Sequence, residues 1–187
     1  MSTGAISRFT KSDVKSINRE MGLLHPVMRS AVYEVLMMCE AEMLPFQLFE
    51  AFRTPQRQHH LYLQGRIPSR PGKIVTGSDS WQSYHQFGLA VDFALVRNKE
   101  FSFDLTDEWM WTRLREIGED YGLEGIENQP GHLQYATLEI AQLRKGSYPG
   151  GGDRSWEENL RQTLRGYPLT SLAKAPASRN ASESVTP

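Results

Sequence analysis

Cysteine is nearly absent from this sequence: Cys39 is the only one among 187 residues. One cysteine cannot form an intramolecular disulfide, and a metal site in this chain cannot rely on several thiolates. Any metal site is therefore expected to use histidine nitrogen and carboxylate oxygen as ligands.

An excess of charge of one sign is also absent, because 21 Lys and Arg residues stand against 22 Asp and Glu residues, a net charge of -1. Nucleic-acid-binding surfaces are normally basic, so we expect no nucleic-acid partner. No apolar run reaches the roughly 18 to 20 residues of a membrane span, and the first residues lack the pattern of a secretory signal. We therefore expect synthesis in the cytoplasm without a signal peptide, and no membrane insertion.

The composition that remains, 39% apolar and 23% charged residues, is typical of a globular protein with one core. We find no internal repeat, and we expect a monomer with a single domain over residues 1–169. From about Thr170 the composition shifts to Ser, Ala, Pro and Asn, which predicts a flexible tail over residues 170–187.

Hydrophobic spacing and breaker residues predict helices and strands in a non-alternating order, which favours the α+β class. A short helix is expected after a cap at Asp13, and a later helix should bury Trp109, Leu114, Ile117 and Tyr121. The predicted helices cover residues 13–19, 26–42, 55–65, 104–122, 140–144 and 156–164, and the predicted strands cover 46–54 and 88–96. Residues 132–140 are expected to form one more strand or a strand-to-helix passage.

The stretch SYHQFGLAVDF places His85 and Asp92 in an apolar, glycine-containing run. A catalytic zinc site needs about three protein ligands and one open position, so the pair requires a third partner. His132 follows the turn-like NQPG and opens a predicted strand, which makes it the third candidate. On spacing alone, His85 and Asp92 are equally well explained as a hydrogen-bonded structural pair.

The other histidines are weaker candidates. His25 stands beside Pro26 at a helix start, where a capping or surface role is expected. His59 and His60 are neighbours on a predicted helix and point about 100 degrees apart, so at most one of them faces a shared site.

Several blocks of the sequence resemble the zinc D-alanyl-D-alanine carboxypeptidase and L-alanyl-D-glutamate endopeptidase family. SYHQFGLAVD matches the zinc motif S-x-H-x-x-G-x-A-x-D, and RTPQRQHHLYLQGR matches R-[ST]-x-x-x-Q-x-x-L-Y-x-x-G-R. PGKIVT, GLE and HLQ follow in the expected order, so the resemblance covers about Pro45 to Gln134. It implies a hedgehog-like fold, with a central antiparallel sheet flanked by helices.

The resemblance also implies the chemistry. It assigns Zn²⁺ to His85, Asp92 and His132, and it makes the stem peptide of peptidoglycan the substrate. Two neutral imidazoles and one carboxylate leave the ion a net positive charge, which suits the activation of water and the polarisation of a carbonyl.

Three more positions take expected roles from the same resemblance. Arg53 would be catalytic, because its permanent charge can bind a substrate carboxylate or a developing oxyanion. Gln58 and Ser83 would bind substrate or orient ligands through hydrogen bonds.

The sequence departs from the family where the catalytic acid is expected, three residues before the last ligand histidine and with proline directly before that histidine. Position 129 is glutamine, and Gly131 separates the proline from His132. An amide cannot accept a proton at neutral pH. We expect the loop 128–131 to bring Glu127 back to the metal as the general base, with Glu124 as the weaker candidate.

The function predicted on this basis is a zinc-dependent peptidoglycan peptidase, with cleavage of L-Ala-D-Glu favoured over D-Ala-D-Ala. The missing signal and the compact domain favour an endolysin that is made in the cytoplasm and acts on the cell wall. One alternative is a non-catalytic, zinc-stapled domain that binds peptide or peptidoglycan, which Gln129 favours. Another is a metal-free interaction domain with ordinary core histidines.

Overall fold

The structure is a computed structural model, and it describes residues 14–135 and 137–167. Two 3-10 helices, five α-helices and five strands are present in these residues. In chain order they are η1 (Met21–Leu23), α1 (Pro26–Ala41), β1 (Phe46–Glu50), α2 (Pro55–Tyr62), η2 (Tyr84–Phe87), β2 (Ala90–Arg97), β3 (Glu100–Ser102), α3 (Glu108–Asp120), β4 (Leu123–Ile126), β5 (Gln129–Tyr135), α4 (Ile140–Arg144) and α5 (Arg154–Gly166).

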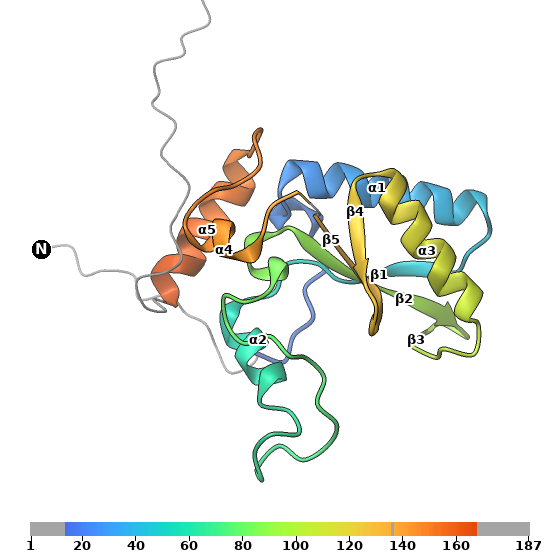
Figure 1. Cartoon of the computed structure of the whole chain (residues 1–187), viewed down its shortest axis with the longest axis horizontal. Helices are drawn as coiled ribbons and strands as arrows, with labels where there is room; N and C mark the ends of the chain where they lie inside the picture. Colours follow the sequence, from blue (N-terminus) through green and yellow to red (C-terminus); the bar gives the residue numbers. More distant parts are fainter. Residues whose placement is uncertain (1–13, 136, 168–187) are drawn as a thin grey trace, which may run out of the picture.

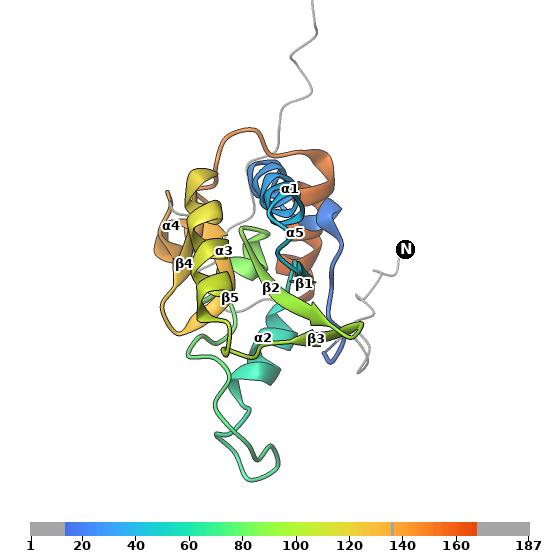
Figure 2. The same cartoon turned by 90° about the vertical axis from the view of Figure 1, so that its right-hand side faces the viewer.

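The strands form one antiparallel sheet in the order β1-β2-β5-β4, and β3 pairs with the end of β2 (Figure 1). Helices α1 and α3 lie together over one face of the sheet, whereas α2 lies on the opposite side (Figures 1 and 2). This arrangement of helices and antiparallel strands confirms the predicted α+β class.

Strand β2 separates the two faces through its alternating side chains. Val91, Phe93 and Leu95 are fully buried and belong to the apolar core beneath α1 and α3. Asp92 points to the opposite face, and the residues paired with it on β1 and β5, Glu50 and His132, share that face. The pleat therefore gathers polar side chains from three strands on the side away from the core.

Helix α1 begins as predicted. Pro26 occupies its first turn, and the His25 ring nitrogen Nδ1 accepts a hydrogen bond from the Val27 amide at 3.2 Å. His25 is fully buried and packs edge-on against Trp156 of α5, so its expected capping role is found, in the interior rather than at the surface.

The helix predicted at residues 13–19 is not formed. Asp13 lies outside the described residues, residues 14–15 make a turn, and residues 16–20 have no regular structure. Tertiary partners take up the backbone carbonyls here: Asn18 accepts from the Ala51 amide at 2.7 Å, and Val14 and Lys15 accept from Arg57. Contacts across the chain thus override a weak local helix signal.

Two further predictions were wrong in detail. The strand predicted to reach Thr54 ends at Glu50, after an irregularity in its pairing with β2, and the Arg53 amide then donates to the His85 carbonyl.

In α3, Trp109 is 60% exposed, and Trp111 occupies the core position instead. Strand β3 was missed because it is short; it follows a two-residue turn with positive φ at Asn98 and Lys99.

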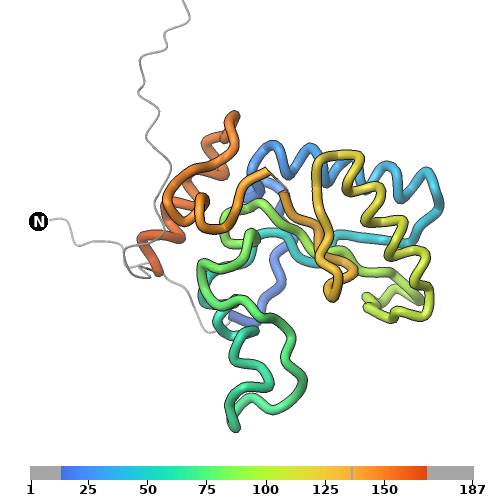
Figure 3. Tube along the Cα trace, viewed as in Figure 1, coloured from blue at the N-terminus to red at the C-terminus, as the bar shows by residue number. Residues whose placement is uncertain are grey.

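Residues 63–83, between α2 and η2, run out from the body of the molecule and return beside the sheet (Figure 3). Helix α5 packs at the end where η2 leads into β2, and the Trp156 indole N–H donates to the Phe87 carbonyl at 2.8 Å. Among the described residues, none of the helices combines the length and the apolar character that a membrane crossing requires. The predicted tail, 170–187, lies outside the described part of the chain.

Candidate metal centre

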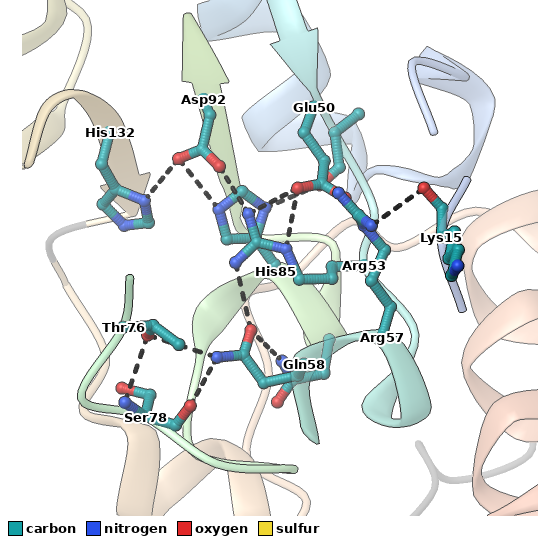
Figure 4. Close-up of polar contacts among 12 residues, drawn as sticks. Lys15, Glu50, Arg53, Arg57, Gln58, Thr76, Ser78, His85, Asp92 and His132 are labelled. Atoms are coloured by element: carbon teal, nitrogen blue, oxygen red, sulfur yellow. Dashed lines mark hydrogen bonds and ion pairs between the residues drawn. The ribbon is translucent and has the colours of Figure 1, made fainter. Parts of the chain in front are cut away.

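Three predicted ligands meet on the polar face of the sheet. Asp92 of β2 and His132 of β5 are paired across the two strands, and His85 of η2 enters from the turn before β2. Gly88 makes that turn possible, because it ends η2 in the left-handed conformation with φ of 68°. Ligand atoms of the three residues all lie within 4.8 Å of one another, and His85 and Asp92 do not form an isolated pair (Figure 4).

One carboxylate oxygen, Asp92 Oδ1, lies between the two imidazoles. It is 3.2 Å from His85 Nε2 and 3.0 Å from His132 Nδ1. The other oxygen, Oδ2, accepts from Arg53 Nη2 at 2.5 Å. The carboxylate is thus oriented by Arg53 while its first oxygen faces both histidines.

The His85 ring provides the test of whether this group suits a cation. Its Nδ1 lies 2.7 Å from the Ala51 carbonyl oxygen, which can only accept, so the neutral ring carries its hydrogen on Nδ1. The lone pair is then on Nε2, which is fully buried and has no hydrogen-bond partner among the described residues. A buried lone pair that faces a carboxylate oxygen suits a metal ion held between them, so the His-Asp-His group can hold one.

Burial and nearby charges favour the protonation states of His85 and Asp92 that metal binding requires. Burial lowers the pKa of His85, and the nearby Arg53 charge lowers it further, so the ring stays neutral. Burial alone would raise the pKa of Asp92, but the permanent charge of the adjacent Arg53 guanidinium helps to hold it well below its usual range. A neutral imidazole beside an ionised carboxylate is the protonation state of a metal-binding pair.

Arg53 is fixed by a buried network that the sequence interpretation missed. Its Nε and Nη2 donate to Glu50 Oε2 at 2.9 and 2.6 Å, and Arg57 donates to the other oxygen of Glu50. Glu50 is 1% exposed, so one buried carboxylate faces two guanidinium groups. A glutamate in an aromatic-rich strand could have been singled out as a buried charge in need of partners.

Gln58 was expected to bind substrate or to orient ligands through hydrogen bonds. It is fully buried: its carbonyl accepts from Arg53 and Gln86, and its amide donates to the Ser78 carbonyl at 2.6 Å. Gln58 therefore links Arg53 to η2 and to the returning loop, which suits a positioning role. Figure 4 shows it on the far side of Arg53 from Asp92.

An open cavity of about 280 Å³ lies against the cluster. Its walls come from residues 76–83, η2, β4, β5 and the start of α4, and they include both histidines, Arg53 and Ser83. Ser83 precedes η2, and its amide donates to Gln86 Oε1 at 3.3 Å. A ligand in this cavity would lie beside the metal-binding atoms.

The proposed base Glu127 is placed less favourably. Most of the loop expected over residues 128–131 belongs to strand β5, and Glu127 is exposed in the tight turn of the β4-β5 hairpin. The described wall of the cavity includes Glu124 and Gln129 but not Glu127. Glu124 is opposite Gln134 in the β4-β5 pairing and accepts from its amide at 2.7 Å.

The remaining histidines lie outside the cluster. His59 Nδ1 is 2.7 Å from Asp79 Oδ1 on a partly exposed surface, and His60 is its neighbour on α2. Neither belongs to the group of potential metal ligands found in the described residues.

Comparisons with known proteins agree with this geometry. The family model described as VanY, D-alanyl-D-alanine carboxypeptidase, matches residues 22–137, more than half of the chain. The chain is also 30% identical over 124 residues to the peptidoglycan L-alanyl-D-glutamate endopeptidase CwlK of Bacillus subtilis (strain 168), covering 63% of this chain and 73% of that protein. The matched region contains the whole His-Asp-His cluster and the strands that carry it. This chain therefore belongs to the VanY D-alanyl-D-alanine carboxypeptidase family.

Proposed function

We propose that this protein is a zinc-dependent peptidase that cuts the stem peptides of peptidoglycan. The observation that carries the proposal is the convergence of His85, Asp92 and His132 beside an open cavity. Membership of the family and the similarity to an endopeptidase of peptidoglycan support the substrate class. Because the curated relative cuts the L-Ala-D-Glu bond, we favour that bond over D-Ala-D-Ala.

A zinc ion held by the three ligands would polarise the scissile carbonyl and make water more acidic. The chain's own groups supply the rest. Arg53 borders the cavity and brings a permanent positive charge to the place where negative charge develops on the substrate. Its bonds to Glu50 and Asp92 hold that charge in place before substrate arrives.

A carboxylate of the β4-β5 hairpin is the proposed proton acceptor. Glu127 follows from the sequence, and Glu124 is favoured by its place in the cavity wall. The pair of variants Glu127→Gln and Glu124→Gln assigns the role, because each removes the basicity and keeps the shape. The variant that lacks the base should lose hydrolysis of purified cell walls while it still binds zinc. Full activity in both variants would remove the hairpin carboxylates from the mechanism.

The direct test of the reaction is digestion of purified peptidoglycan followed by mass spectrometry of the fragments. Cleavage at L-Ala-D-Glu produces new amino termini on D-glutamate, whereas release of free D-alanine alone would identify a carboxypeptidase. The endolysin role remains a prediction, and lysis of outer-membrane-permeabilised cells by added protein would support it.

A non-catalytic, zinc-binding domain of the same fold is the second candidate function, and Gln129 is the observation that favours it. Gln129 lines the cavity near His132, where an amide cannot accept a proton. Peptidoglycan binding without any release of fragments, at full zinc occupancy, would establish this alternative and overturn the peptidase.

A further inference from the structure

Gln134 lies two residues after His132 on β5, so both side chains point to the same face of the sheet. It is 8% exposed and contacts two polar groups. Its Oε1 is 3.0 Å from His132 Nε2, and its Nε2 is 2.7 Å from Glu124 Oε1. The three side chains, all of which line the cavity, form a continuous chain of polar contacts from His132 to Glu124.

The hydrogen atoms along this line can be assigned from chemistry. An ionised carboxylate only accepts hydrogen bonds, so the group of Gln134 that faces Glu124 must be its NH₂. The opposite side of the amide, the oxygen, then faces His132 and can also only accept. His132 Nε2 must therefore carry a hydrogen, and in the neutral ring the lone pair is on Nδ1.

That lone pair points to the cluster, because Nδ1 is the nitrogen 3.0 Å from Asp92 Oδ1. Two acceptors at this distance repel each other unless a proton or a cation lies between them. His85 reaches the same state through the Ala51 carbonyl, which leaves its Nε2 facing the same oxygen. In each ring, therefore, one nitrogen donates a hydrogen bond to a protein oxygen and the other nitrogen faces Asp92 Oδ1.

We propose that Gln134 and Glu124 are positioning residues for His132: Glu124 orients the Gln134 amide, and the amide holds the ring in the Nε2–H tautomer that offers Nδ1 to the metal. This inference rests on the proposed metal-dependent function. The main contribution comes from Gln134, which is buried, whereas water can partly replace the exposed Glu124.

Gln134→Met tests the proposal, because methionine keeps the length of the side chain and removes both polar groups. We expect zinc affinity, measured by competition with a chromogenic chelator, to fall about 10- to 100-fold, the usual loss when the hydrogen-bond partner of a ligand histidine is removed. Glu124→Met, on the exposed hairpin, should fold normally and should show a smaller loss.

A donor–acceptor exchange separates positioning from mere packing. In the double variant Glu124→Gln with Gln134→Glu, the new carboxylate accepts from both His132 and the new amide, so the chain of hydrogen bonds is kept. Zinc affinity should return towards the wild-type value, above that of Gln134→Met. Gln47→Met is the matched control, since Gln47 is an exposed glutamine of β1 that does not line the cavity, and its zinc affinity should match wild type.

Nitrogen NMR of the zinc-free protein provides a readout that needs no metal. The neutral His132 ring should appear as the Nε2–H tautomer in wild type and as a mixture in Gln134→Met. Undiminished zinc affinity and an unchanged tautomer in Gln134→Met would overturn this inference and leave the proposed function intact. A wild-type protein that binds no zinc would overturn the proposed function, and the role at the metal with it.

Discussion

The candidate metal centre has two unlike halves. The arginine half, Glu50, Arg53 and Asp92, is tied together by charged hydrogen bonds of 2.5 to 2.9 Å, and its glutamate is 1% exposed. The hairpin half, His132, Gln134 and Glu124, is joined by single hydrogen bonds and ends at an exposed carboxylate. Buried charges fix Asp92 in the arginine half, whereas the hairpin half ends at solvent.

The largest expected effect comes from removing the ligand that joins the halves. His132→Ala should lower cell-wall hydrolysis by more than about a thousandfold, because the loss of metal assistance costs several kcal/mol of transition-state stabilisation. His59→Ala is the control, since His59 pairs with Asp79 on a partly exposed surface, and its activity should be unchanged. Wall hydrolysis that survives in His132→Ala would show that the halves do not act through a shared metal.

The arginine half should dominate stability. Glu50→Gln leaves Arg53 and Arg57 without their shared buried carboxylate, and it should lower the free energy of unfolding by about 3 to 5 kcal/mol in urea denaturation. Glu42→Gln is the matched substitution, because Glu42 pairs with Arg113 where solvent screens the charges, and we expect a much smaller change. Equal effects of the two substitutions would contradict the distinction between the halves.

The contact between β5 and β2 can be disturbed through Gly131, directly before His132. A Cβ at this position would overlap the Phe93 carbonyl oxygen and lie 3.2 Å from the Trp111 ring. We expect Gly131→Ala to destabilise the fold by about 1 to 3 kcal/mol and to weaken zinc binding through a shift of His132. Gly150→Ala, with open space around the added methyl, should change neither quantity. Unchanged stability and zinc affinity in Gly131→Ala would show that β5 accommodates the methyl group without moving His132.

The smallest effect concerns the core shared by both halves. Burial raises the pKa of the Cys39 thiol to about 11, so the folded protein keeps it protonated at pH 8.5, whereas a thiol in the unfolded chain is at most about half ionised there. Because the unfolded state loses this proton first, stability should decline slightly as the pH rises above about 8.5. Iodoacetamide should label Cys39 slowly in the native protein and rapidly in urea; rapid native labelling would indicate an open core.

The three proposed metal ligands were predicted from the family resemblance. The structure brings His85, Asp92 and His132 together, and the start of α1 at Pro26 and the central strand β2 follow from local sequence patterns. The buried partners of Arg53 were not foreseen, since Glu50 and Arg57 acquire their roles only when β1 and α2 pack together.

The hairpin was the least predictable part of the site. A loop was expected over residues 128–131, but the chain pairs Ile126 with Gln129 and leaves only a tight turn for Glu127. Strand pairing with β2 favours this arrangement, because the pairing of Asp92 with His132 sets the register of β5. The same register places Gln134 opposite Glu124, a contact that spacing along the chain does not indicate.

The most direct test of the account is the zinc stoichiometry of the wild-type protein, purified without chelators and analysed by elemental mass spectrometry beside Asp92→Asn. The account predicts one zinc ion per chain in the wild type and loss of that ion in the variant. No more than a trace of zinc in the wild type, even after incubation with excess zinc and desalting, would contradict it.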